Sequence, residues 1–168
     1  AIIAGDIATE EDIAKIRAAT DIPVEVFVHG ALCVAYSGQC LTSEAIGGRS
    51  ANRGACAQAC RLPYSLVVDG EARDTGDRAF LLSPEDLEAS ALIPQLSALG
   101  VASVKIEGRL KADSYVAATT ALYRQSVDAA AGDAAPPDEA TRARALQMFT
   151  RGSGPGFLAG VDHQRLVD

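Results

Sequence analysis

No apolar run in the chain approaches the roughly 18 to 20 residues that a membrane-spanning helix needs. A charged region followed by an apolar stretch, the pattern of a secretory signal, does not open the sequence either. Positive charge is scarce, with 15 lysines and arginines against 22 acids. The net charge of −7 argues against a broad, nonspecific grip on nucleic acid but is compatible with a local basic patch. We therefore expect a cytoplasmic protein without a membrane span.

The composition also argues against long-range disorder. Hydrophobic residues make up 48% and charged residues 22% of the chain, as in ordinary globular proteins. Its 168 residues suffice for one compact core or for a piece of something larger. The chain starts at Ala1, inside what reads as a buried strand with no lead-in. We expect it to be a segment of a longer protein.

Strands and helices alternate in the hydrophobic pattern. Strands are predicted over residues 1–4, 24–28 and 101–106, and helices from residue 9 onward, over 113–130 and over 138–149. This alternation favours an α/β fold with a parallel sheet and right-handed crossovers. Three such strands cannot close an eight-stranded barrel, so a barrel requires further N-terminal units.

Two more elements are predicted in the middle of the chain. Residues 64–68 and 79–82 read as the strands of a hairpin that turns near Asp69-Gly70. Ser83, Pro84 and the two acids that follow read as the start of a helix. This helix is predicted to run to about residue 98 and to be broken at Pro94.

Cysteine is absent outside a window of 28 positions. The window holds Cys33, Cys40, Cys56 and Cys60, separated by six, fifteen and three residues. It falls within residues 29–61, which are rich in Gly, Ser and Asn and read as a long ordered loop. A loop of that length needs a structural reason, and the cysteines supply one.

Several explanations of the cysteines compete. Paired disulfides suit small secreted domains, which this chain does not resemble, and unrelated buried thiols conflict with the polar neighbours. A four-thiolate metal site remains, with structural zinc or an iron-sulfur cluster as the choices, since soft thiolates suit both. The tight two-residue spacings of structural zinc are absent, which leans slightly toward iron-sulfur. Arg49, Arg53 and Arg61 could compensate the thiolate charge or be solvated loop charges.

Five motifs carry a family resemblance: EVFVHGALC at 25–33, YSGQC at 36–40, RSANRGACAQACR at 49–61, LSP at 82–84 and KIEGR at 105–109. With them the sequence closely resembles the collagenase-like peptidase family U32 over most of residues 24–130. The resemblance implies a TIM-barrel-like fold, of which this chain is the C-terminal portion. It also implies a 4Fe-4S cluster bound by Cys33, Cys40, Cys56 and Cys60.

Despite the peptidase name, the resemblance implies hydroxylation, either of tRNA or ribosomal RNA bases or of the ubiquinone ring. Gly-Gly-Arg-Ser at 47–50 and Cys-Arg-Leu-Pro-Tyr at 60–64 are most similar to the branch associated with a ribosomal RNA cytidine. The chain departs from the family pattern at Gly5-Asp6, where Arg-Glu is usual, at Ala59 for Pro, and at Thr150 for Asn. Substrate contacts are therefore not carried over to the first and last of these.

The predicted division of the chain has two parts. Residues 1–131 form a partial barrel with the cluster-binding loop at 29–61. Residues 132–168 form a linker, a helix and a C-terminal tail that starts a following region.

Lys105, Glu107 and Arg109 share one side of the predicted strand if it stays extended to its end. Charged side chains at the C-terminal end of a barrel strand commonly line the active-site mouth, so these three are predicted as catalytic residues. A structural ion pair is the alternative. Glu25, among Val and Phe, needs a partner if it is buried. His29 is predicted as a proton donor near the cluster, with a packed, hydrogen-bonded histidine as the alternative.

The sequence thus predicts an enzyme for iron-sulfur-dependent hydroxylation of RNA, with RNA as its substrate. The alternatives are a peptidase of the U32 type and a noncatalytic, metal-stabilised binding module. A peptidase needs an activated nucleophile or a metal-bound water, but the chain has no HExxH or Gly-x-Ser-x-Gly motif. Ser37 and Ser43 have no identifiable base partner. The sequence names neither an electron donor nor an oligomeric state.

Overall fold

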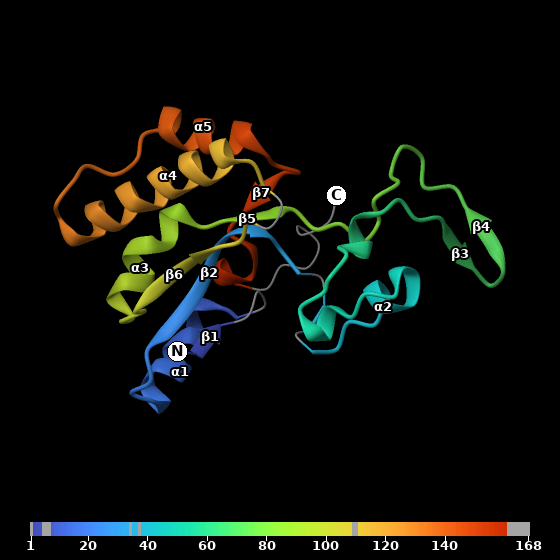
Figure 1. The fold of residues 1–168 in the computed structure, drawn as a ribbon, viewed down its shortest axis with the longest axis horizontal. Coiled ribbons are helices and arrows are strands. Elements are labelled where there is room, and N and C mark those ends of the chain that lie inside the picture. Colours follow the sequence, from blue (N-terminus) through green and yellow to red (C-terminus); the bar gives the residue numbers. More distant parts are fainter. Residues whose placement is uncertain (1, 5–7, 34, 37, 109–110, 161–168) are drawn as a thin grey trace. The chain divides into compact units, whose positions relative to one another are not determined.

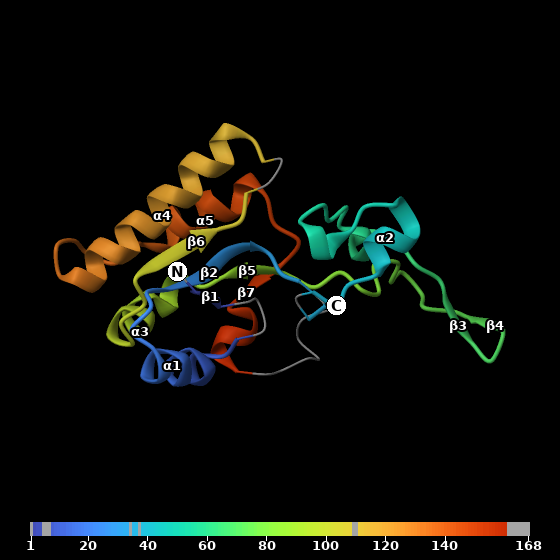
Figure 2. The same ribbon diagram turned by 60° about the horizontal axis from the view of Figure 1, so that its bottom comes forward.

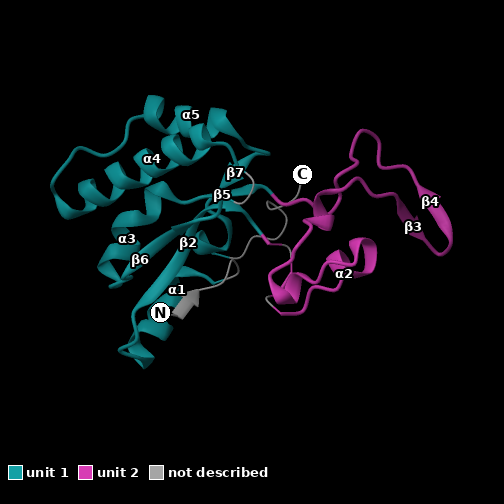
Figure 3. Ribbon diagram, in the orientation of Figure 1, with its two compact units in different colours: residues 1–32, 85–161 teal, residues 33–84, 162–168 magenta. Residues whose placement is uncertain are grey.

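The structure is a computed structural model that describes residues 2–4, 8–33, 35–36, 38–108 and 111–160. It divides into two compact units, the first made of residues 1–32 and 85–161 and the second of residues 33–84 and 162–168 (Figure 3). The second unit is therefore inserted between two halves of the first along the chain.

A mixed five-stranded sheet forms the centre of the first unit (Figure 1). Its strands are β1 (Ile2–Ala4), β2 (Val24–Ala31), β5 (Asp86–Glu88), β6 (Ser103–Ile106) and β7 (Ser153–Gly154). Strand β2 pairs in parallel with β1 and β6 and antiparallel with β5, and β5 pairs in parallel with β7. The mixed α/β class is thus confirmed, whereas the TIM-barrel-like part of the prediction stays a prediction.

Helices cover the sheet in the first unit. They are α1 (Glu10–Ala19), α3 (Ile93–Ala98), α4 (Asp113–Ala131) and α5 (Glu139–Met148). Figure 2 shows α4 and α5 on one side of the sheet and α1 on the other. Local capping explains two of the starts, because Thr9 forms a capping box with Asp12 and the side chain of Asp138 accepts from the backbone of Thr141. Short 3-10 turns complete the unit at η3 (Ser90–Leu92) and η4 (Gly156–Ala159).

The core of the first unit follows from alternation along β2. Val24, Val26 and Val28 are buried, while Glu25 and Phe27 between them are half-buried. Fully buried partners from helices and a strand include Ile13, Leu87, Leu96 and Leu122. The predictions of strands near residues 1–4, 24–28 and 101–106, and of helices from residue 9, at 113–130 and at 138–149, are confirmed.

The second unit contains little regular structure. Its elements are α2 (Thr42–Gly47), the 3-10 turns η1 (Ala51–Arg53) and η2 (Ala59–Arg61), and the hairpin strands β3 (Leu66–Val68) and β4 (Glu71–Arg73). The predicted loop at 29–61 is thus correct in outline, but β2 extends through Ala31 and three short helical elements interrupt the loop.

The predicted partner of the first hairpin strand is wrong. Strand β3 pairs with β4 and not with residues 79–82. Asp69 and Gly70 both have positive φ, at 53° and 84°, and such a two-residue turn closes a tight hairpin between its immediate neighbours. Ala79 contributes only a carbonyl, which accepts from the backbone N–H of Tyr64 at 2.8 Å.

The prediction of a helix that starts at Ser83 is also wrong. Residues 86–88 form strand β5 instead, and the helix α3 begins at Ile93 with Pro94 in its first turn. The backbone of residues 86–88 pairs with β2 and β7, so tertiary pairing overrides the local capping signal. Pro94 starts the helix rather than breaking it, since the first turn needs no intrahelical N–H donor there.

Two further predictions concern the outline of the chain. Helix α5 and strand β7 belong to the same compact unit as α4, so the structure has no unit boundary at residue 131. In the described ranges of the chain, no helix is both long enough and apolar enough to cross a membrane.

Candidate functional site

The cysteine-bearing unit is held together by polar contacts. The buried hydroxyl of Ser43 on α2 accepts from the backbone N–H of Ala57 at 2.8 Å. The backbone N–H of Cys40 donates to the side chain of Asn52 at 3.1 Å, which joins the segment before α2 to η1. Because Gly48 ends α2 in a left-handed conformation, the chain can turn back toward η1.

This unit has almost no hydrophobic core of its own. Of its described residues, only Ser43, Ala59 and Pro84 are buried. It also contains nine of the thirteen exposed large hydrophobic side chains in the described chain: Tyr36, Leu41, Ile46, Leu62, Leu66, Val67, Val68, Phe80 and Leu82. Units of fewer than about 70 residues that lack a core usually depend on disulfides or a metal. A cross-link of this kind would therefore stabilise residues 33–84.

The four cysteines are available to provide that cross-link. None of them forms a disulfide, and Cys33 is exposed while the other three are half-buried. Burial raises the pKa of the Cys60 thiol, Arg61 partly offsets this, and the other three cysteines raise that pKa further. The thiol of Cys60 therefore lies within electrostatic range of the other three cysteines.

The described residues contain no group of three or more His, Cys, Asp or Glu side chains arranged to hold a metal ion. A single tetrahedral zinc, with Zn–S bonds of about 2.3 Å, would bring its thiolates to about 3.8 Å from each other. A 4Fe-4S cluster instead binds each thiolate through a different iron and spaces them further apart. The four cysteine thiols lie in one unit that has almost no core, and this donor set fits a 4Fe-4S cluster. The described thiols do not have the close spacing that a single zinc ion would impose.

Neighbouring groups already bond to this cysteine segment. The backbone N–H of Gln58, a residue with positive φ, donates to Sγ of Cys56 at 3.2 Å. The guanidinium of Arg61 donates to the hydroxyl of Ser83 at 2.9 Å and to the carbonyl of Pro84. Arg61 therefore anchors η2 to the end of the unit, in addition to its effect on Cys60.

A second cluster of polar groups lies inside the first unit, around His29. A register shift between Phe27 and His29 against β6 breaks the alternation of β2 and buries His29, which is 3% exposed. Nδ1 of His29 lies 3.3 Å from the hydroxyl of Tyr123, and the two rings meet edge to face. The packed, hydrogen-bonded histidine anticipated as the alternative reading is what the structure contains.

The hydrogen bonds of Tyr123 assign the tautomer of His29. The Tyr123 hydroxyl donates to the carbonyl of Val28 at 2.5 Å and accepts from the N–H of Ala89 at 3.0 Å. Burial raises the pKa of Tyr123 well above its ordinary value, so the hydroxyl is protonated. Its one proton is used in the hydrogen bond to the carbonyl of Val28. Nδ1 of His29 must then carry its own proton and donate it to Tyr123.

His29 is consequently a neutral imidazole at neutral pH. Burial lowers its pKa, and the nearby carboxylates of Glu88 and Asp86 offset this only in part. With Nδ1 protonated, Nε2 of the neutral ring is the unprotonated nitrogen, which can accept a proton or a hydrogen bond. The geometry favours a proton acceptor, whereas the predicted role of proton donor would require a protonated Nε2.

Replacing Tyr123 by phenylalanine tests this network. The substitution removes one hydroxyl that serves Val28, Ala89 and His29, so we expect a loss of about 1 to 3 kcal/mol in unfolding free energy. We also expect the ¹⁵N signals of His29 to shift toward a mixture of tautomers. Tyr115→Phe is the control, because that hydroxyl makes a single bond, to the carbonyl of Glu107 at 3.0 Å. Equal losses for the two variants and an unchanged tautomer would contradict the assignment.

Two buried acids flank His29 on β5, and sequence reasoning missed both. Glu88 is 3% exposed and accepts from the N–H of Ser90 at 2.8 Å and from Arg142 at 2.6 and 2.7 Å. Burial alone would raise the pKa of Glu88, but the bonds from Ser90 and Arg142 together lower it. Asp86 is paired with Arg151 at 2.5 Å. The polar-apolar alternation of residues 86–88 is the signal that could have revealed a strand bearing these acids.

Of the three predicted catalytic residues near residue 107, the structure describes Lys105 and Glu107. Lys105 lies 3.9 Å from Glu25 on the neighbouring strand and over the ring of Phe27, so the anticipated ion pair with another strand is present. Glu107 lies past the end of β6, and its N–H donates to the carbonyl of His29 at 2.8 Å. Arg109 lies outside the described residues.

Gly30 explains how closely Glu107 approaches β2. Its φ is +115°, and a Cβ at this position would lie 2.5 Å from the carbonyl oxygen of Glu107. Only glycine fits such a conformation at such a distance. The segment after β6 is thereby held against the C-terminal end of β2.

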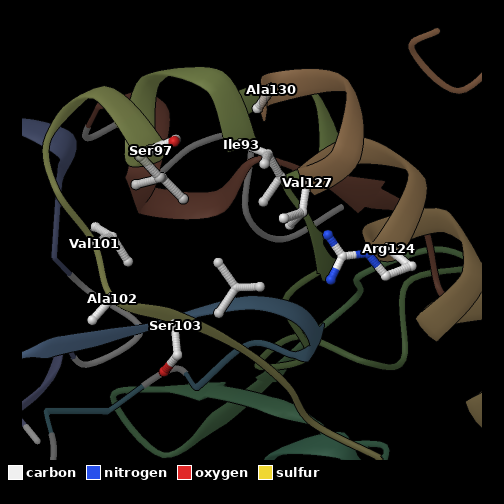
Figure 4. A pocket seen from close by; sticks show the side chains of 10 residues that line it. Ile93, Ser97, Val101, Ala102, Ser103, Arg124, Val127 and Ala130 are labelled. Atoms are coloured by element: carbon white, nitrogen blue, oxygen red, sulfur yellow. The ribbon is translucent and has the colours of Figure 1, made fainter. Parts of the chain in front are cut away.

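A cavity of about 250 Å³ lies elsewhere in the first unit, between α3, β6 and α4. Figure 4 shows side chains from the two helices on one side and from residues 101–103 on the other. Most of its wall is apolar, with Arg124, Ser97 and Ser103 as the polar exceptions. None of the predicted site residues lines it.

Comparison with known proteins adds a family to this geometry. The model of the family described as peptidase family U32 matches residues 2–168. The chain is 46% identical over 150 residues to a 23S rRNA 5-hydroxycytidine synthase of Escherichia coli, a match covering 89% of the chain and 23% of that protein. It is 39% identical over 127 residues to tRNA hydroxylation protein P1 of Bacillus subtilis, covering 73% of the chain and 30% of that protein.

A relative named for another activity is also similar. The chain is 34% identical over 141 residues to a collagenase of Porphyromonas gingivalis, a match covering 83% of the chain and 39% of that protein. The chain spans less than half the length of each of these three relatives. No solved structure matches the chain.

Proposed function

The chain belongs to peptidase family U32, and on that premise we propose that it serves in the hydroxylation of RNA with a 4Fe-4S cluster on its four cysteines. The observation that carries the proposal is a unit with almost no core, in which Cys60 lies within electrostatic range of the other three cysteines. Relatives named for ribosomal RNA and tRNA hydroxylation support RNA as the substrate. We further propose a cytoplasmic location and a place for the sheet in the C-terminal portion of a TIM-barrel-like fold.

The cluster would be held by Cys33, Cys40, Cys56 and Cys60. When bound, such a cluster supplies one-electron chemistry, with a potential tuned by hydrogen bonds to its sulfurs. The residues of this chain would provide that tuning, since the N–H of Gln58 already reaches the thiol of Cys56. Their other contribution is to order the segment that presents the four thiols.

In the first unit, His29 is proposed as a proton acceptor through Nε2. Tyr123 holds the tautomer, and Glu88 and Asp86 supply negative charge nearby that would stabilise the protonated imidazole. Nζ of Lys105 lies 3.9 Å from the carboxylate of Glu25, which supports a positioning role for Lys105. The proposed roles of Glu107 and Arg109 as catalytic residues rest on their predicted place at the C-terminal end of a barrel strand.

Peptidase activity is the second candidate, because a similar protein is named a collagenase. The chemistry of the described residues favours it less. The hydroxyl of Ser43 is buried and bonded to a backbone N–H, which does not activate it as a nucleophile. A cysteine that binds a cluster is not a free nucleophile either. A noncatalytic metal-stabilised module would have the same unit but no turnover.

Two measurements on the complete protein test the proposal. Anaerobic purification should yield about four irons and four sulfides for each chain, as expected for one thiolate per iron. Mass spectrometry of RNA from cells that lack the protein should show the loss of one hydroxylated nucleoside. A colourless protein with one zinc would refute the cluster, and an unchanged nucleoside profile would refute RNA hydroxylation. Cleavage of collagen-like peptides at the same rate by a Cys56→Ala variant would favour the peptidase.

A further inference from the structure

Positive charge gathers on one segment of the cysteine-bearing unit, residues 33–64, in an otherwise acidic chain. Between residues 33 and 64 there are three arginines, Arg49, Arg53 and Arg61, and one acid, Glu44, whereas the whole chain has a net charge of −7. This segment is therefore a local basic patch of the kind that the overall composition allows.

Two of the three arginines form no ion pair among the described residues. Arg61 is half-buried, bonds to Ser83 and Pro84, and acts on the pKa of Cys60, which burial raises and Arg61 lowers. Arg49 and Arg53 are exposed, and the ion pairs among the described residues involve neither of them. An exposed guanidinium without an acid partner is available to an external anion.

Backbone contacts place these two arginines on one framework. The N–H of Arg49 donates to the carbonyl of Ser43 on α2 at 3.4 Å, and the N–H of Arg53 donates to the carbonyl of Ser50 at 3.2 Å. Gly48 and Gly54, both with positive φ, turn the chain beside each arginine. The two guanidinium groups are thus presented by adjacent turns of the same short segment.

An exposed aromatic ring lies in the segment that precedes α2, which a hydrogen bond joins to η1. Tyr36 is 66% exposed and begins a turn in which the N–H of Gln39 donates to its carbonyl at 3.1 Å. The next residue, Cys40, donates to Asn52, which directly precedes Arg53. Proteins often bind unpaired RNA by stacking a base on an aromatic ring while arginines contact the phosphates. Tyr36, Arg49 and Arg53 offer the same groups, and the bond from Cys40 to Asn52 links their segments.

We propose that Arg49, Arg53 and Tyr36 form the surface of the cysteine-bearing unit that binds single-stranded RNA, the arginines contacting phosphates and the tyrosine stacking on a base. This inference rests on the proposed function, since it assigns to this surface the RNA that is to be hydroxylated. It adds which residues bind the RNA, and it adds that the bound strand is unpaired.

Binding of a labelled single-stranded oligoribonucleotide of mixed sequence to the complete, metal-loaded protein tests the proposal. The double variant Arg49→Gln, Arg53→Gln should weaken binding about 25-fold at about 0.1 M salt and reduce the salt-dependence slope by about 1.4, because two phosphate contacts on a single strand are lost. Tyr36→Leu should weaken binding about tenfold without changing the slope.

A matched control removes the same charge from the same unit. Arg73 and Arg78 are also exposed, and the variant Arg73→Gln, Arg78→Gln should bind RNA like the wild type. Equal binding by the two double variants would overturn the proposal, and so would loss of iron from the Arg49, Arg53 variant, which would assign these arginines to the metal site. An equal loss of polyglutamate binding would also overturn it, by identifying a general anion patch. If the Arg49→Gln, Arg53→Gln variant binds and hydroxylates RNA normally, these residues do not form the RNA-binding surface, while the proposed function stands.

Discussion

Replacing Cys56 by serine is expected to abolish metal loading and RNA hydroxylation together. A structural metal in a small domain contributes free energy on the order of 10 kcal/mol to folding, and residues 33–84 have almost no core to replace it. We expect iron and sulfide to fall to background and the hydroxylated nucleoside to disappear from cellular RNA. Backbone amides of residues 33–84 should exchange hydrogen faster, while those of the sheet unit keep their protection, because the valine-rich core of β2 is independent of the cysteines.

Ala57→Ser is the control for this substitution. It introduces the same hydroxymethyl group one residue further along, at an exposed position, and leaves all four thiols in place. Wild-type iron content and RNA hydroxylation are expected for it. A Cys56→Ser protein that modifies RNA at the wild-type level, with or without iron, would contradict the role given to the cluster.

Replacing Arg142 by alanine is expected to destabilise the sheet unit by about 3 kcal/mol. The carboxylate of Glu88, whose side chain is 1% exposed, would keep its charge in the interior but lose its only guanidinium partner among the described residues. Breaking a buried ion pair from one side typically costs about 3 to 5 kcal/mol, and the lower end applies because the Arg142 side chain is 42% exposed. Denaturant unfolding of the wild type and the variant measures this difference.

Arg124→Ala provides the comparison for Arg142→Ala. Arg124 pairs with Asp128 one helical turn away, in an exposed pair on α4, and such pairs contribute only about 0.3 to 0.5 kcal/mol. Similar losses for the two variants would show that burial of Glu88 does not matter. The double variant Glu88→Gln, Arg142→Ala should lose less than the sum of the single losses, since the unpaired charge is gone.

The pair also predicts the pH dependence of stability. The folded-state pKa of Glu88 is lowered: burial opposes ionisation, but Ser90 and Arg142 outweigh it. The stabilisation is therefore fully present above the unfolded-state pKa and is lost as pH falls through the lowered folded-state pKa. In Arg142→Ala this acid-side loss should become smaller, because the folded-state pKa of Glu88 moves upward.

Local sequence signals were sufficient where the structure depends on neighbours in the chain. The alternating valines of β2, the capping box at Thr9 and the apolar stripe of α4 each predicted an element that the structure contains. The cysteine window predicted a long ordered loop at 29–61, and in the structure this segment has little regular structure beyond short helical elements. The family resemblance from the same motifs is confirmed over residues 2–168.

Signals that compete with tertiary pairing failed. Residues 83–86 have the capping pattern of a helix, but the backbone of Asp86 to Glu88 finds partners on β2 and β7, and its carboxylates find Arg151 and Arg142 from distant parts of the chain. No local pattern encodes those partners. The alternation of residues 86–88 could have indicated a strand that bears these acids, but their place beside His29 and their arginine partners required the tertiary structure.

The sequence by itself determined which atoms are available for chemistry: four thiols in one segment, a histidine at the end of a strand, and three arginines beside the cysteines. Only the tertiary structure decided their states. It buried His29 against Tyr123 and lowered its pKa, placed Lys105 3.9 Å from Glu25, bonded Arg61 to Ser83 and left Arg49 and Arg53 exposed. The physical reason is that charge, tautomer and availability depend on burial and on partners far away in the chain, which residue type and spacing do not specify.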